Sequence, residues 1–207
     1  MCGIIAPMEK NETEQTNESE VFPEAETLKQ ESSFWGEVFR FAIIATLIVL
    51  PIRLYIAQPF IVSGASMVPT FESGDYLIVD EVSYRFEKPE RGDVIVFRFP
   101  EDPSTFFIKR IIGLPGEKIA MKGGKVQVTG RDDSVQTLDE TYLEDYPNGD
   151  FDTVLLGYDE YFVMGDNRNA SADSRIWGAL PKKLIVGRAL VRLFPLSDIE
   201  LYPGAIQ

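Results

Sequence analysis

The chain has 207 residues with one cysteine, no histidine and a formal net charge of −13. Its length suits one domain of about 150 residues plus an appendage. Without histidine, Ser-His-Asp triads and histidine-containing metal sites are excluded. The lone Cys2 cannot form an internal disulfide or a cysteine metal cluster. We expect no nucleic-acid partner, because phosphate binding requires a basic face.

The first 33 residues contain eight Glu, two Lys and few large apolar side chains. Such a segment cannot bury enough apolar surface to offset the entropy lost on ordering. We expect residues 1–33 to form a disordered acidic tail.

A strongly apolar segment follows. The uncharged run at 41–52 has 12 residues, too few to cross roughly 30 Å of hydrocarbon. Residues 38–56 would suffice if Arg40 and Arg53 snorkel to the two surfaces, with Trp35 and Tyr55 at the interfaces. We therefore predict a single transmembrane helix with its flanks at 34–57. A buried core helix, a secretory signal segment and an amphipathic surface helix are the alternatives.

From residue 58 the sequence becomes short alternating apolar stretches separated by Gly and Pro, which indicates strands and turns. The expected strands are 60–62, 76–82, 94–99, 106–112, 118–121, 125–129, 161–164 and 185–194. We predict a mostly β domain at 58–207 built on a coiled antiparallel sheet, which hides its strand edges. Residues 130–160 are interpreted as loops or a weak hairpin.

Without an imidazole, a serine nucleophile needs another base, and a lysine made neutral by desolvation can serve. Lys109 lies in an apolar strand, on the face shared by Phe107 and Ile111. Ser66 lies where a strand enters a Gly-containing bend, which allows a substrate backbone to approach and frees an amide. An edge-strand lysine facing solvent and a structural turn are the alternative interpretations of these two residues.

A third polar segment, Gly-Asp-Asn-Arg-x-x-Ser-x-Asp-Ser-Arg, occupies residues 165–175. It follows an apolar strand and is too polar for a core element. A loop with structural Asp-Arg pairs explains it, and a calcium-like site is a weaker alternative because the spacing is not that of an EF-hand.

Taken together, these segments resemble bacterial type I signal peptidases (leader peptidases), which are Ser-Lys dyad serine proteases. The resemblance spans about residues 34–195. Four motifs carry it: Ser-Gly-x-Ser-Met-x-Pro-Thr at 63–70, Arg-Gly-Asp-Val at 91–94, Lys-Arg-x-x-Gly-Leu-Pro-Gly-Glu at 109–117, and the segment 165–175. All four occur in the order expected for the family.

The resemblance implies a role for each matching residue. Ser66 would be the nucleophile and Lys109 the general base. Ser171 would hold the lysine, while Asp173 and Arg175 would form an ion pair that shapes the loop. The supporting residues would be Asp166 and Arg168. The Ser66 amide would supply one oxyanion donor, and Gly64 leaves the second unassigned, because some relatives have a serine there.

The resemblance also implies substrate and location. Shallow apolar pockets for an Ala-x-Ala cleavage site would be lined by Phe60, Val62, Met67 and Ile108. The chain would act as a monomer on preprotein signal peptides at a phospholipid membrane. It would be a single-pass protein of the plasma membrane, with the tail cytoplasmic and the catalytic domain extracytoplasmic. No metal or organic cofactor is implied.

Two other functions remain open. One is a related Ser-Lys protease with a narrower task, such as processing a pilin or cleaving itself as a repressor does. The other is an inactive membrane-anchored binding protein that retains the fold. The second is disfavoured because Ser66, Lys109, Ser171, Asp173 and Arg175 are all present.

Overall fold

A computed structural model describes residues 34–55, 57–147 and 149–205. The expected tail at 1–33 lies outside these residues. The chain divides into two units with a boundary between Phe41 and Ala42, which lies within the N-terminal helix.

The N-terminal helix α1 covers Phe34–Tyr55, where the apolar segment predicted a helix. Its apolar side chains are largely exposed, with Phe39 at 69% and Leu47 at 68%. No helix in the described part of the chain is both long enough and apolar enough to cross a membrane. The predicted helix is therefore confirmed, but the predicted membrane span at 38–56 is not.

The remainder is mostly β, as predicted. The strands are β1 (Ala57–Ile61), β2 (Tyr76–Asp80), β3 (Val94–Arg98), β4 (Phe106–Gly113), β5 (Lys118–Lys122), β6 (Lys125–Thr129), β7 (Val135–Thr137), β8 (Phe151–Leu155), β9 (Glu160–Met164), β10 (Leu180–Pro181), β11 (Ile185–Phe194) and β12 (Glu200–Leu201). A short helix, α2 (Ser174–Trp177), precedes β10. All eight predicted strands are present.

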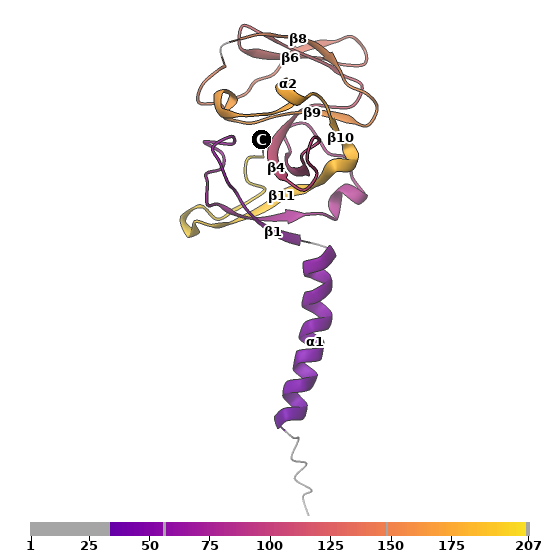
Figure 1. Cartoon of the computed structure of the whole chain (residues 1–207), viewed down its shortest axis with the longest axis vertical. Coiled ribbons are helices and arrows are strands. Elements are labelled where there is room, and N and C mark those ends of the chain that lie inside the picture. The colour runs from indigo at the N-terminus through magenta and orange to yellow at the C-terminus, as the bar shows by residue number, and fades with distance from the viewer. Residues whose placement is uncertain (1–33, 56, 148, 206–207) are drawn as a thin grey trace, which may run out of the picture. The chain divides into compact units, whose positions relative to one another are not determined.

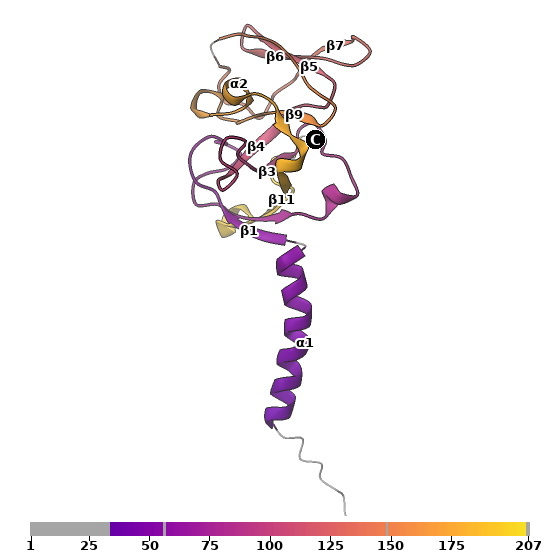
Figure 2. The ribbon, with the colours of Figure 1, turned by 45° about the vertical axis from the view of Figure 1, so that its right-hand side comes forward.

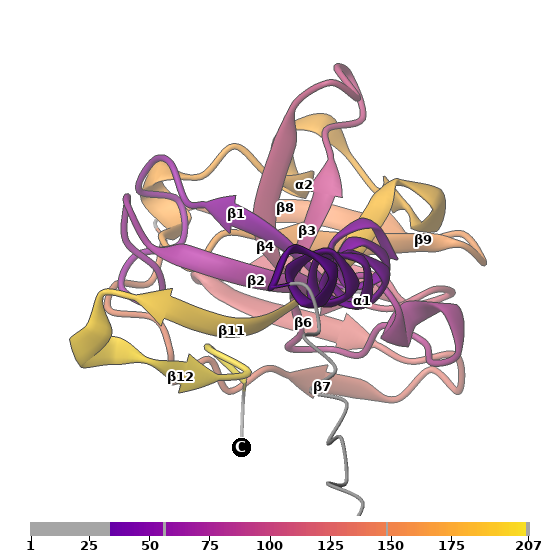
Figure 3. The same cartoon turned by 90° about the horizontal axis from the view of Figure 1, so that it is seen from below.

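Two antiparallel sheets form the domain. The larger has the order β1-β2-β11-β3-β4-β9-β10, with β12 paired to β11. The smaller has the order β7-β6-β5-β8, and it contains β7 and β8, which lie in the segment interpreted as loops or a weak hairpin. The small sheet and β1 lie at opposite ends of the domain (Figures 1 and 2). Figure 3 shows β11 and β12 side by side.

The large sheet buries side chains on both faces, as strand β3 shows. Ile95 and Phe97 pack in one apolar cluster with Ile111, whereas Val94 packs in another with Met67. Alternate residues of a strand point to opposite faces, so both faces of β3 are covered. The same alternation in β4 sends Lys109 and Arg110 to opposite sides of the sheet.

Candidate active site

The centre of the site is a contact between two side chains far apart in the sequence. The Lys109 Nζ of β4 lies 2.7 Å from the Ser66 Oγ, and it also donates to the Ile108 carbonyl at 2.8 Å. Ser66 belongs to the turn that follows β1. The structure therefore brings together the serine and the lysine that the sequence singled out.

Lys109 is only 4% exposed, and its Nζ lies 5.4 Å from the centre of the Phe107 ring. Burial lowers the pKa of Lys109 from 10.5 to about 8, against the opposing effect of the Asp173 and Asp166 carboxylates. Desolvation disfavours the charged ammonium. A substantial fraction of this amine is therefore neutral at mildly alkaline pH.

The backbone of Ser66 is held by the loop that follows β9. The Asn167 amide donates to the Ser66 carbonyl at 3.0 Å. A Cβ at Gly165 would collide with both the Ser66 carbonyl oxygen and the Ser171 Oγ, so only glycine permits this close approach. The first residues of the 165–175 loop thus fix the position of Ser66.

Asp173 and Arg175 form a two-pronged ion pair at the far end of this loop. Arg175 Nε lies 2.7 Å from one Asp173 oxygen and Nη2 lies 2.8 Å from the other. Asp173 also caps α2 by accepting from the Arg175 amide, and it accepts from the Gly165 amide at 3.0 Å. Such bidentate, charge-assisted contacts hold a loop in one geometry.

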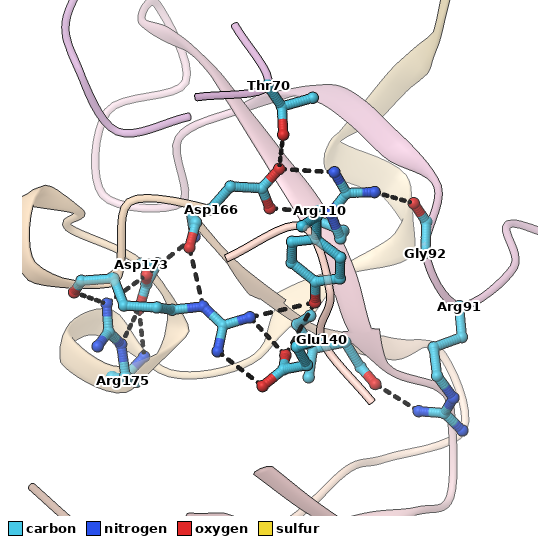
Figure 4. A network of polar contacts seen from close by, with 12 residues as sticks. Thr70, Arg91, Gly92, Arg110, Glu140, Asp166, Asp173 and Arg175 are labelled. Atoms are coloured by element: carbon cyan, nitrogen blue, oxygen red, sulfur yellow. Dashed lines mark hydrogen bonds and ion pairs between the residues drawn. The ribbon is translucent and has the colours of Figure 1, made fainter. Parts of the chain in front are cut away.

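Asp166 and Arg168 have partners outside the loop, which sequence reasoning missed. Asp166 pairs with the buried Arg110 of β4 through contacts of 2.8 and 2.6 Å, and it accepts from the Thr70 hydroxyl at 2.6 Å (Figure 4). Arg168 pairs with the buried Glu140 at 2.5 and 3.2 Å. Glu140 lies in the segment interpreted as loops, and no local spacing in the sequence indicated either pairing.

Ser171 does not form the expected hydrogen bond with Lys109. Its hydroxyl is buried and makes no hydrogen bond within the described part of the chain, so it does not hold the Lys109 amine here. The Lys109 Nζ is instead bonded to Ser66 and to the Ile108 carbonyl.

A cleft of about 300 Å³ opens beside the Ser66 and Lys109 side chains. Three of the four residues expected to form apolar pockets, Phe60, Val62 and Ile108, line it. Met67 does not: it is 1% exposed and packs in the core, because its side chain leaves the turn in another direction from Ser66. Ala170 and Ala172 also line the cleft, which the sequence analysis did not propose.

The acidic side chains of the site face arginines. Among the described residues, no group of three or more Cys, Asp or Glu side chains is arranged to hold a metal ion.

Comparison with known proteins identifies the family of this chain. A family model described as "Signal peptidase, peptidase S26" matches residues 35–194. Signal peptidase I of Leptolyngbya laminosa is 40% identical over 77% of this chain and 80% of its own. Probable signal peptidase I-1 of Synechocystis is 42% identical, over 74% and 80%. A probable thylakoidal processing peptidase 2 of Arabidopsis thaliana is 34% identical, over 77% and 44%. The chain belongs to the signal peptidase family, peptidase S26, whose members cleave signal peptides from preproteins.

Proposed function

We propose that this chain removes signal peptides from exported preproteins with Ser66 as the nucleophile and Lys109 as the general base. The observation that carries the proposal is the 2.7 Å contact between the Lys109 Nζ and the Ser66 Oγ. A base within hydrogen-bonding distance of a hydroxyl is the first requirement for activating it.

The reaction begins when the neutral Lys109 amine accepts the Ser66 hydroxyl proton while the oxygen attacks the scissile carbonyl carbon. A C–O bond forms and the carbonyl becomes an oxyanion. When that intermediate collapses, the C–N bond breaks and the Lys109 ammonium returns the proton to the leaving amine. Water then attacks the ester carbonyl carbon while Lys109 accepts a proton from the water. When this second intermediate collapses, the C–O bond to Ser66 breaks, the acid product leaves, and the Lys109 ammonium returns the proton to the Ser66 oxygen.

The lowered pKa of Lys109 supports its role. With a pKa of about 8, the free base forms near neutral pH, whereas an exposed lysine remains protonated there. Loss of the proton creates the active form, so activity increases as the pH rises through this value.

The amide of Ser66 is proposed as an oxyanion donor. No hydrogen bond from this amide occurs within the described residues, so it is available to a developing negative charge. Gly64 has a φ of +99° and no hydroxyl, so it offers no second side-chain donor.

The cleft supports a preference for small side chains. Phe60, Val62 and Ile108 give it apolar walls, and its volume of about 300 Å³ must also accept the peptide backbone. We assign it to an Ala-x-Ala cleavage site, with Met67 supporting the turn from the core.

The paired residues of the 165–175 loop are assigned to positioning. Asp173 with Arg175 holds Gly165, and Arg168 donates to the Gly165 carbonyl at 2.9 Å. Asp166 is held by Arg110. None of these groups needs to touch the substrate, because together they fix the segment that contacts Ser66.

Family members are membrane-bound, and we propose that α1 attaches this chain to a membrane. Exposed apolar side chains on the helix, such as Phe41 at 74%, support contact with lipid. The catalytic domain would face the side to which preproteins are exported, with the acidic tail in the cytoplasm. The plasma membrane is the expected location, and the thylakoidal relative makes the thylakoid membrane the alternative to test by fractionation.

The experiment is cleavage of an Ala-x-Ala preprotein by the full chain in detergent with phospholipid. Ser66→Ala and Lys109→Ala should each abolish cleavage, while Ser104→Ala and Lys125→Ala, at exposed positions, should retain it. Full activity of Lys109→Ala would refute the dyad. An inert wild type that still bound the preprotein would favour the binding-protein alternative.

A further inference from the structure

The segment after β12 contacts Leu190 of β11 and Arg110 of β4. Tyr202 donates its amide to the Leu190 carbonyl at 2.7 Å, Pro203 is buried, and the Gly204 carbonyl accepts a hydrogen bond from Arg110 Nη1. The family match ends at residue 194, so this contact comes from outside the matched region. The contact joins Gly204 to Arg110, the residue that follows Lys109 in the sequence.

Arg110 is completely buried, so its guanidinium needs protein acceptors. Nε and Nη2 bond Asp166, and Nη1 bonds both the Gly92 carbonyl, at 2.9 Å, and the Gly204 carbonyl. The guanidinium carbon also lies 4.1 Å from the centre of the Tyr142 ring. Removal of the Gly204 acceptor would leave a buried donor unsatisfied, which weakens the hold on the whole group.

We propose that Gly204 is a positioning residue of the active site, which holds Arg110 against Asp166 and thereby sets the charge felt by Lys109. This inference rests on the proposed role of Lys109 as the base. The contact acts through Arg110 and touches neither the substrate nor the reacting atoms.

The charged groups around Lys109 give the direction of the effect. They are two compensated pairs, Asp166 with Arg110 and Asp173 with Arg175. Both carboxylates raise the pKa of Lys109. A loosened Arg110 leaves Asp166 less compensated, which favours the ammonium and moves the alkaline rise in activity to higher pH.

Position 204 requires glycine for two reasons. Its φ is +76°, and a Cβ would lie 2.6 Å from the Thr70 Cγ2 and 3.1 Å from the Arg110 Nη2. Gly123 provides a matched control, because its φ is +59° but a Cβ there would meet nothing within 4 Å. Gly123→Ala therefore introduces comparable backbone strain without a collision at the site.

The test is the pH profile of kcat/KM for preprotein cleavage by the full chain. We expect Gly204→Ala to lower kcat/KM at pH 8 by about tenfold, as for a buried polar group left unpaired. The midpoint of the alkaline rise in kcat/KM should move upward by about half a pH unit. Gly123→Ala should leave both values unchanged. Adding Thr70→Ser to Gly204→Ala removes the colliding methyl, keeps the hydroxyl that bonds Asp166, and should recover part of the rate and the midpoint.

Three outcomes would overturn the inference: an unchanged Gly204→Ala profile, a lowered rate with an unmoved midpoint, or an equal shift in Gly123→Ala. If Gly204→Ala does not fold, a chain ending at Tyr202 removes the carbonyl without a collision and should show the same rate loss and shift. Failure of the proposed dyad would appear separately, as full activity of Lys109→Ala or a wild type without activity.

Discussion

The buried Lys109, proposed as the general base, should also destabilise the fold, and Lys109→Met tests this. Burial lowers the pKa of Lys109 from 10.5 to about 8. Each pH unit of that difference corresponds to about 1.4 kcal/mol, so protonated Lys109 reduces the free energy of unfolding by about 3 kcal/mol. Methionine avoids this penalty but loses the contacts with Ser66 and the Ile108 carbonyl, each worth about 1 kcal/mol. We expect an inactive variant about 1 kcal/mol more stable at pH 7.

The sharper test is how the difference in free energy of unfolding between Lys109→Met and the wild type depends on pH. In the unfolded chain Lys109 keeps its proton up to about pH 10.5, whereas in the folded protein it releases the proton near pH 8. The penalty is therefore complete below pH 8, decreases as the pH rises from 8 to 10.5, and vanishes above that range. The advantage of Lys109→Met should decrease and reverse over the same interval.

The assay is reversible urea unfolding of the wild type and Lys109→Met at pH 7 and pH 10.5. Lys125→Met is the control, because Lys125 is exposed and removing it takes away no buried amine. A difference for Lys109→Met that did not change with pH, or a variant that gained stability relative to the wild type as pH rose, would refute the desolvation argument.

Three further predictions concern the buried Glu140–Arg168 ion pair, the pH profile of the wild type and the cleft. Glu140→Gln leaves Arg168 as an unpaired buried cation and should lower the free energy of unfolding by about 3–5 kcal/mol, measured by urea unfolding; a loss below 1 kcal/mol would contradict the burial of the pair. The wild-type kcat/KM should fall about tenfold per pH unit below pH 8, and a flat profile from pH 6 to 9 would exclude Lys109 as the base. Ala172→Leu adds three carbons to a wall of the cleft, so it should raise KM for an Ala-x-Ala substrate while leaving the free energy of unfolding nearly unchanged. Ala205→Leu, at an exposed position, should leave KM unchanged.

The sequence predicted those parts of the fold that depend on local pattern. All eight strands predicted from short apolar stretches between Gly and Pro were found. Alternation is clear in β2 and β6, whereas β3 and β9 are continuous apolar runs that are buried on both faces. The four strands that were missed lack these signals: β7 is exposed at every residue, β8 has no fully buried residue, and β10 and β12 have two residues each. These strands form because neighbouring strands offer them hydrogen-bonding partners.

The candidate site shows the same limit. The segments carrying Ser66 and Lys109 could be identified from residue type and surroundings, and the family motifs united them. The partners Arg110 with Asp166 and Arg168 with Glu140 are 56 and 28 positions apart, and only the tertiary fold reveals them. Met67 shows a different limit, because the direction of a side chain in a turn depends on backbone angles that residue type does not determine.

The alternation of β4 makes the chemistry depend on strand register. Lys109 faces the cleft and Arg110 faces the supporting loop, and β4 is paired with β3 through five consecutive residues of each strand. A one-residue slip of this pairing would exchange the two sides. A guanidinium that cannot lose its proton would then enter the cleft, while the titratable amine would lie beside Asp166. The composition would be unchanged, yet Ile111 and Ile112 would leave their apolar clusters and the proposed base would be lost. Catalysis therefore depends on the hydrogen-bonding frame of this strand as well as on its side chains.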